Sequence, residues 1–198
     1  MIAKEKRRLT VYGHVPLDIK NRKRIDYSEF YVGSTTELGR RIRNHLLLTK
    51  SQRGAKKTRK WVLKYGSITP VLFITGFTKF RYALSFEKAL QTYKLPKHIK
   101  SSVPITIRRL IHVLHKKTWS VNRPIPDAIT LPKLTIHWIR PEFKPNPSDY
   151  YLDFPTTHIR HIHLTSYSEI DNIILDNIIN NNNKVLKKLI QNCLHLNT

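Results

Sequence analysis

Cysteine and long apolar runs are almost absent from this chain of 198 residues, and each absence excludes a class of protein. Cys193 is the only cysteine, which excludes an internal disulfide bond and any structural zinc site built from cysteine thiolates. No run of 18 apolar residues occurs, and basic residues follow directly after Ile2, so we expect neither a membrane-spanning helix nor a signal peptide. We therefore expect an intracellular protein, either nuclear or, for a viral source, in some host-cell compartment.

Acidic residues are also scarce, with 13 Asp and Glu against 36 Lys and Arg and a net charge of +23. Such a surplus repels itself unless a polyanion lies against it, so nucleic acid is the expected partner. An anionic membrane is the competing partner, and we expect no membrane association. Residues 1–60 hold 17 basic and 5 acidic side chains, whereas residues 150–198 hold 4 of each. The nucleic-acid surface is therefore expected in the N-terminal part.

Apolar periodicity predicts an α+β fold: a small three-stranded antiparallel sheet flanked by helices. The predicted strands are residues 10–15, 30–33 and 70–75. The predicted helices are residues 37–50, 81–93 and 105–114, the first capped by Ser34, Thr35 or Thr36. Residues 51–60 are basic without apolar periodicity and are expected to form a solvated loop. Residues 134–139 alternate in polarity and are expected to form an edge strand or an extended packing segment.

A domain boundary is predicted near residue 145, because four prolines interrupt residues 141–157. Residues 1–145 would form the main domain with its helical continuation. Residues 146–198 would be a linker and a helical C-terminal extension, with two short helices on either side of Asn180–Asn183. Their Ile- and Leu-rich stripes must be buried, either on the main domain or in a homodimer.

Five residues occur in an order that suits phosphodiester hydrolysis, which needs a nucleophile, neutralisation of the phosphate charge and help for the leaving oxygen. Tyr12 closes the tripeptide Thr-Val-Tyr, Tyr31 opens Tyr-Val-Gly, and Arg41, His45 and Glu87 follow. Singly, each has a simpler explanation: aromatic packing in a strand, a solvated helix face or a surface carboxylate. Their joint order and spacing resemble the GIY-YIG endonuclease superfamily.

The resemblance extends to a narrower group, the Slx-type structure-specific junction endonucleases. Gly54–Arg59 before Trp61 is similar to their G-A-[KR]-[KR]-T-[RK] segment, and Gly76–Phe77 with Ala83–Gln91 is similar to their G-F-x5-A-L-x-F-E-x-A-L-Q segment. The similarity covers roughly residues 9–145. The C-terminal cysteine-rich zinc domain of that group has no counterpart here, which argues against pairing with a scaffold subunit.

The resemblance implies a role for each matched position. Tyr12 would act as general base toward water, while Tyr31 and Arg41 would grip the scissile phosphate. Glu87 would hold one divalent ion, Mg²⁺ or Mn²⁺, and His45 would orient water or the tyrosine. Arg41 and the metal charge would favour the phenolate of Tyr12. Basic residues expected to contact DNA are Lys23, Arg24, Arg40, Arg43, Lys56, Lys57 and Arg59.

The resulting prediction is a metal-dependent endonuclease that cuts branched or flapped DNA, in recombination, repair or viral genome processing. One alternative is a GIY-YIG nuclease that cuts ordinary duplex in repair or homing. Another is a non-catalytic basic DNA-binding protein. A metal site at His158, His161 and His163 is disfavoured, because their spacing of three and then two fits neither face of one strand.

Overall fold

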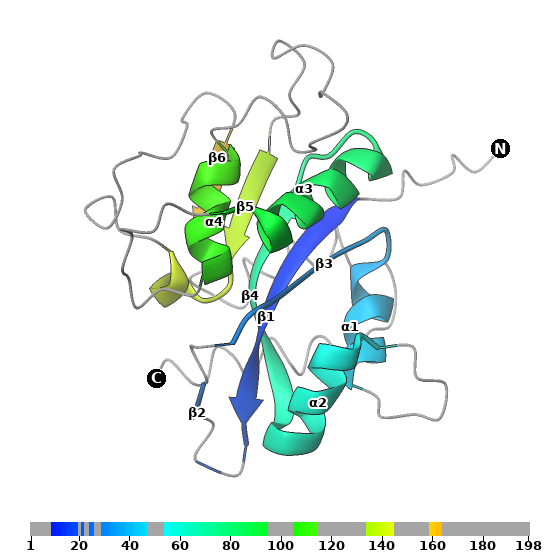
Figure 1. Cartoon of the computed structure of the whole chain (residues 1–198), viewed down its shortest axis with the longest axis vertical. Coiled ribbons are helices and arrows are strands. Elements are labelled where there is room, and N and C mark those ends of the chain that lie inside the picture. Colours follow the sequence, from blue (N-terminus) through cyan, green and yellow to red (C-terminus); the bar gives the residue numbers. More distant parts are fainter. Residues whose placement is uncertain are drawn as a thin grey trace, which may run out of the picture.

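The computed structural model of the chain describes residues 9–19, 21, 24–25, 29–46, 54–94, 105–114, 134–144 and 159–163. Its strands are β1 (Thr10–Asp18), β2 (Arg24–Ile25), β3 (Tyr31–Thr35), β4 (Gly66–Thr75), β5 (Leu134–Trp138) and β6 (Ile159–His163). Its helices are α1 (Leu38–Leu46), α2 (Lys56–Tyr65), α3 (Phe80–Thr92), α4 (Ile105–Leu114) and the short 3₁₀ helix η2 (Pro141–Phe143) (Figure 1).

The strands form one sheet in the order β2-β1-β4-β5-β6, with β3 also paired to β1. β2 pairs with the end of β1 at Leu17 and Asp18, whereas β3 pairs with its first half. All these pairings are antiparallel except that of β5 with β6. The predicted α+β class is therefore confirmed, and the three predicted strands overlap the first part of β1, the first part of β3 and the last part of β4.

The sheet is larger than predicted, because β5 is an interior strand and β6 is added beyond it. β5 pairs with β4 on one side and with β6 on the other, so the predicted edge position of residues 134–139 is wrong. β6 lies within the segment predicted to be a linker and helical extension. Its pairing is parallel and long-range, which local sequence does not reveal. The predicted C-terminal helices and their dimer contact lie outside the described residues.

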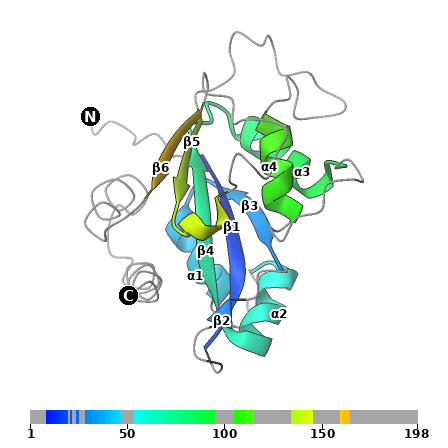
Figure 2. The ribbon, with the colours of Figure 1, turned by 90° about the vertical axis from the view of Figure 1, so that its left-hand side faces the viewer.

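The two faces of β1 are buried in different surroundings, because side chains alternate along a strand. Val11 and Val15 belong to the main core, which includes Phe86 of α3 and Leu110 of α4. Figure 2, in which the sheet is seen nearly edge-on, shows α3 and α4 together on one side of it. Tyr12 falls between these valines in the strand, is fully buried, and makes its hydrogen bonds to side chains of α1.

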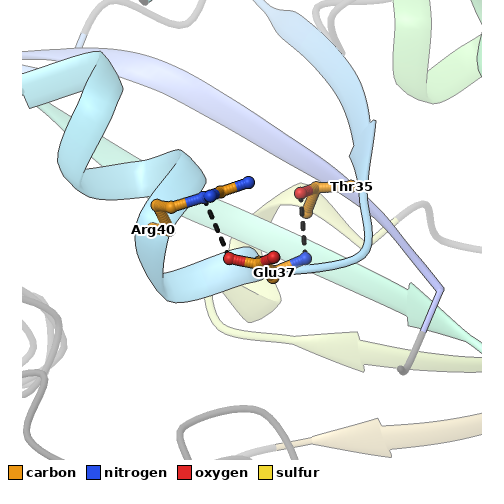
Figure 3. A network of polar contacts seen from close by, with 3 residues as sticks. All are labelled: Thr35, Glu37 and Arg40. Carbon is orange, nitrogen blue, oxygen red and sulfur yellow. Dashed lines mark hydrogen bonds and ion pairs between the residues drawn. The ribbon is translucent and has the colours of Figure 1, made fainter. Parts of the chain in front are cut away.

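The cap residue of α1 is Glu37, whose carbonyl accepts a hydrogen bond from the Arg41 N–H, rather than the predicted Ser34, Thr35 or Thr36; Thr35 instead holds the turn before the helix. The Oγ1 of Thr35 accepts a hydrogen bond of 3.1 Å from the backbone N–H of Glu37, and the Glu37 carboxylate pairs with Arg40 at 2.9 Å (Figure 3). Leu38 and Ile42 are buried at a spacing of four residues. The amphipathic pattern thus fixes which face of α1 points inward, and that face includes His45.

The second helix was not predicted: α2 begins at Lys56, inside the segment expected to be a loop, and ends at Tyr65. The inward face of α2 consists of Thr58, Trp61 and Val62, at the spacing of one helical face. Since the first of these residues is polar, apolar periodicity is not visible before Trp61. Among the described helices, none combines the length and the apolar character needed to cross a bilayer.

Candidate active site

The phenol of Tyr12 is the centre of a buried hydrogen-bond cluster. Its oxygen lies 2.8 Å from His45 Nε2, and Arg41 Nε donates to the same oxygen at 3.1 Å. Arg41 and His45 lie four residues apart on α1, so one helix face presents both side chains to the same atom. Three of the five predicted catalytic residues therefore meet at one oxygen.

Tyr31 joins this cluster through its ring. The centroids of the Tyr31 and His45 rings lie 5.2 Å apart, and those of Tyr31 and Tyr12 lie 6.2 Å apart. Gly33 makes room for this packing, because it lies opposite Tyr12 in the β1–β3 ladder. A Cβ atom on Gly33 would lie 2.6 Å from the Tyr12 oxygen and 3.1 Å from a Tyr31 ring carbon. The glycine is thus needed for the close approach of the two tyrosines.

His45 is held from its other side by the start of α2. Its Nδ1 lies 2.7 Å from Thr58 Oγ1, and the Ala55 backbone N–H donates to the same nitrogen at 3.3 Å. Gly54 permits this contact, since a Cβ there would meet the backbone oxygen of Asn44 at 2.7 Å. The segment quoted above as G-A-[KR]-[KR]-T-[RK] therefore has a structural role: it positions His45.

Two proton arrangements satisfy the His45 contacts. In the first, Nδ1–H donates to Thr58, whose hydroxyl donates to the Ala55 carbonyl at 3.0 Å, and Nε2 accepts the Tyr12 proton. In the second, Nδ1 accepts from the Ala55 N–H, and Nε2–H donates to Tyr12. The imidazole can therefore either receive a proton from Tyr12 or donate one to it.

Glu87 approaches the cluster from α3 and is fixed by two neutral donors. The Ser34 hydroxyl donates to Glu87 Oε2 at 2.5 Å, and Gln91 Nε2 donates to Oε1 at 2.9 Å. Ser34 follows Gly33 in β3, and Gly33 lies opposite Tyr12, so the carboxylate is joined to the tyrosine cluster through this strand. Each carboxylate oxygen keeps further lone pairs for a cation.

Glu87 fits a single hard cation better than a protein-built metal cage. Within the described part of the chain, no three His, Cys, Asp or Glu side chains gather at one point. Mg²⁺ commonly binds through one or two carboxylates, with waters and substrate phosphates as its other ligands. Donors to the carboxylate, here Ser34 and Gln91, orient such a ligand.

Burial keeps Tyr12 and His45 uncharged. Burial and then Tyr31 raise the pKa of Tyr12, and the opposing effect of Arg41 is smaller. Arg41 does favour the phenolate, as expected, but burial and Tyr31 outweigh it, so Tyr12 is a neutral phenol in the protein alone. Burial, followed by the Arg41 charge, lowers the pKa of His45 to about 4, so His45 is neutral at physiological pH.

Arg41 remains charged in the same surroundings. Burial alone would lower the pKa of Arg41, but the oxygens of Tyr12 and Tyr31 together raise it above its ordinary value. The site thus places one fixed positive charge beside the neutral phenol of Tyr12 and the neutral imidazole of His45. This arrangement attracts an anion such as a phosphate.

His14 is a site residue that the sequence analysis missed. It is fully buried two residues after Tyr12, and its ring centroid lies 5.0 Å from that of Tyr12 and 6.0 Å from that of His45. Neither of its ring nitrogens makes a hydrogen bond of good geometry within the described residues. Burial and the nearby His45 lower its pKa well below the ordinary value, and the Thr69 backbone opposes them.

Other partners of the site were also missed, although their positions in the sequence could have indicated them. Ser34 follows the Tyr-Val-Gly tripeptide directly, Gln91 is four residues after Glu87, and Thr58 lies within the segment shared with the Slx-type group. His14 follows Tyr12 at the two-residue spacing that places both on one face of a strand.

The residues predicted to bind DNA have different surroundings. Arg40 pairs with Glu37, and Lys57 pairs with Glu29 at 2.7 Å and donates to the Phe30 carbonyl at 3.1 Å. Lys56 is exposed, and Arg59 is half-buried. The remaining three predicted side chains, those of Lys23, Arg24 and Arg43, lie outside the described residues.

Comparison with known proteins shows two similarities. An uncharacterized protein of Acanthamoeba polyphaga mimivirus is 35% identical over 78 residues, which are 38% of this chain and 43% of that protein. The chain thus spans less than half the length of this relative.

Residues 20–100 match the family model of the GIY-YIG catalytic domain. This segment contains four of the predicted catalytic residues, whereas Tyr12 precedes it. GIY-YIG nucleases generally depend on a divalent metal ion, and their substrate is DNA. The match supports a GIY-YIG catalytic domain within residues 20–100 of this chain, a domain type found in endonucleases.

Proposed function

We propose that this chain is a DNA endonuclease that hydrolyses phosphodiester bonds at the cluster around Tyr12. The observation that carries the proposal is the meeting of Arg41 and His45 at the Tyr12 oxygen, with Glu87 fixed across the adjacent strand. This combination offers a proton acceptor, a positive charge and a cation ligand at one place. These are the groups that phosphodiester hydrolysis needs.

Tyr12 acts as a proton relay to His45. The attacking water gives its proton to the Tyr12 oxygen as Tyr12 passes its own proton to His45 Nε2. The new bond joins the water oxygen to phosphorus, and the bond from phosphorus to the leaving sugar oxygen breaks. Because His45 accepts the proton, no free phenolate forms, which matches the raised pKa of Tyr12. In this tautomer Nδ1–H donates to Thr58, whose hydroxyl donates to the Ala55 carbonyl, and the Ala55 N–H no longer donates to Nδ1.

Arg41 and Glu87 would neutralise the charge of the phosphate. The guanidinium of Arg41 stays charged beside two phenols and attracts the phosphate oxygens. Glu87, oriented by Ser34 and Gln91, would hold one divalent ion, Mg²⁺ or Mn²⁺, which would stabilise charge on the phosphate and on the leaving oxygen. The imidazolium formed transiently at His45 is stabilised by the negative charge of the substrate.

Branched or flapped DNA is the proposed substrate, by resemblance to the Slx-type nucleases. Support comes from the segment with Gly54, Ala55 and Thr58, which the structure uses to hold His45. The resemblance therefore includes residues that touch the proposed relay. Cleavage of ordinary linear duplex at an equal rate would favour the repair or homing type of nuclease instead.

The test is a cleavage assay with the purified chain and Mg²⁺ on labelled 5′-flap, fork, Holliday-junction and linear duplex DNAs. Glu87→Gln is expected to abolish cleavage while DNA binding survives, because it removes the cation ligand but no basic contact. The matched control is Glu37→Gln, which removes an equally charged carboxylate from an exposed ion pair and should leave cleavage intact. Cleavage by Glu87→Gln at the wild-type rate would reject the site.

A further inference from the structure

A second cationic site lies along α2. It is an open hollow of about 510 Å³, lined by Lys56, Lys57, Lys60 and Lys64. The rings of Trp61 and Tyr65 and the carboxylate of Glu29 complete its lining. Four ammonium groups around one carboxylate leave a strong positive excess, so an anion is the ligand that this hollow suits.

The lysines are arranged as a row along the helix. Lys56, Lys60 and Lys64 recur every four residues, so they share one face of α2. At 1.5 Å of rise for each residue, the row extends about 12 Å along the helix axis. A small anion would contact only part of such a row, whereas a polyanion with regularly spaced charges would contact all of it.

The hollow is connected to the proposed active site through the start of β3. Lys57 donates to the carbonyl of Phe30, the residue before Tyr31. Tyr31 packs against the buried cluster of Trp61, Val62 and Ile68, and its ring also lies close to the rings of Tyr12 and His45. A polyanion bound at the active site can therefore continue across β3 into the hollow.

The aromatic rings of the hollow are already covered by lysines. Lys57 lies 5.1 Å from the centroid of the Trp61 ring, Lys64 lies 4.7 Å from that of Tyr65, and only 5% of Trp61 is exposed. Binding of single-stranded nucleic acid depends on open aromatic faces on which bases stack. With its rings covered, the hollow offers ammonium groups rather than a stacking platform, which favours the sugar-phosphate backbone of a duplex.

We propose that this hollow binds the backbone of duplex DNA beyond the scissile phosphate, with Glu29 limiting the affinity. Glu29 is the single acid of the lining and holds the Lys57 ammonium at 2.7 Å, so a phosphate must compete with it for that lysine. The proposal rests on the proposed nuclease function, because it concerns the path of the same substrate. It assigns Lys60, Lys64 and Glu29, which the family resemblance does not single out.

The experiment uses the full chain and a labelled linear duplex, with binding measured over a range of salt concentrations without divalent metal. Lys60→Gln/Lys64→Gln should weaken binding and reduce the slope of log K against log salt by about 1.8, at about 0.9 for each lost phosphate contact. Glu29→Gln should act in the opposite direction, with tighter binding and a slope steeper by about 0.9, because Lys57 becomes available to a phosphate. The ion pair removed is exposed and contributes little to folding, so this variant should fold.

The control is Lys79→Gln/Lys94→Gln, which makes the same charge change at exposed positions at the two ends of α3. An equal loss in this control would show that only net charge matters and would overturn the proposal. So would an unchanged slope in Lys60→Gln/Lys64→Gln, no gain in Glu29→Gln, or a loss confined to single-stranded DNA. Since binding is read without cleavage, a wild-type chain that binds duplex but never cuts it would contradict the nuclease function alone.

Discussion

Acid should destabilise this protein through His45, and the effect can be worked out from the structure. The imidazole is 1% exposed, and burial together with the Arg41 charge lowers its pKa from 6.5 to about 4. The unfolded chain therefore binds a proton near pH 6.5, whereas the folded chain resists it until about pH 4. The contribution of the neutral His45 to the free energy of unfolding is fully present above pH 6.5. It is lost as the pH falls from 6.5 toward 4, because the unfolded state takes up the proton first.

The magnitude follows from the difference between the two pKa values. One pKa step corresponds to about 1.4 kcal/mol, so the complete loss for His45 is about 3 kcal/mol, of which between about 2 and 3 kcal/mol is lost by about pH 4.5. His14 acts in the same direction, because burial also holds its pKa well below the ordinary value. The wild-type protein should therefore lose at least the His45 contribution between neutral and acidic pH.

Urea unfolding at pH 7.5 and at pH 4.5, for the wild type and for His45→Gln, would measure this contribution. The glutamine changes packing and hydrogen bonds at both pH values, so the two pH values must be compared within each protein. The difference between pH 7.5 and pH 4.5 should be smaller in the variant by between about 2 and 3 kcal/mol. An identical pH dependence in both proteins would refute the buried, neutral state of His45.

Three further predictions concern groups around Tyr12. Thr58→Val keeps the shape of the side chain but removes the hydroxyl 2.7 Å from His45 Nδ1, so cleavage should fall by about 10- to 100-fold. A thermal melt should still show a cooperatively folded protein, and full activity would exclude Thr58 from the relay. Gly33→Ala places a Cβ 2.6 Å from the Tyr12 oxygen, so the free energy of unfolding should fall by about 1–3 kcal/mol and cleavage should also fall. An unchanged melting temperature in calorimetry would contradict that packing. Arg41→Lys loses the Nε–H that donates to Tyr12, so cleavage should fall by about 100-fold or more in single-turnover assays; rescue by lysine would reduce Arg41 to a general positive charge.

Much of the local structure follows from the sequence alone, because its causes are local. Apolar spacing predicted helices over residues 37–50, 81–93 and 105–114, which overlap α1, α3 and α4. The order of Tyr12, Tyr31, Arg41, His45 and Glu87 predicted the resemblance to the GIY-YIG catalytic domain, whose family model matches residues 20–100. Four of these residues do meet in one cluster, and Glu87 joins it through β3. Their catalytic roles remain predictions for the assays above.

The rest depends on contacts between distant parts of the chain, which no local pattern encodes. β6 joins the sheet by parallel pairing with β5, and α2 was not predicted because the first residue of its inward face is the polar Thr58. That threonine meets His45, thirteen residues away, and Ser34 meets Glu87, fifty-three residues away. The protonation state of Tyr12 was likewise decided by the fold. The sequence places a positive charge at Arg41, but only the tertiary structure shows that Tyr12 is fully buried, and burial raises its pKa by more than Arg41 lowers it.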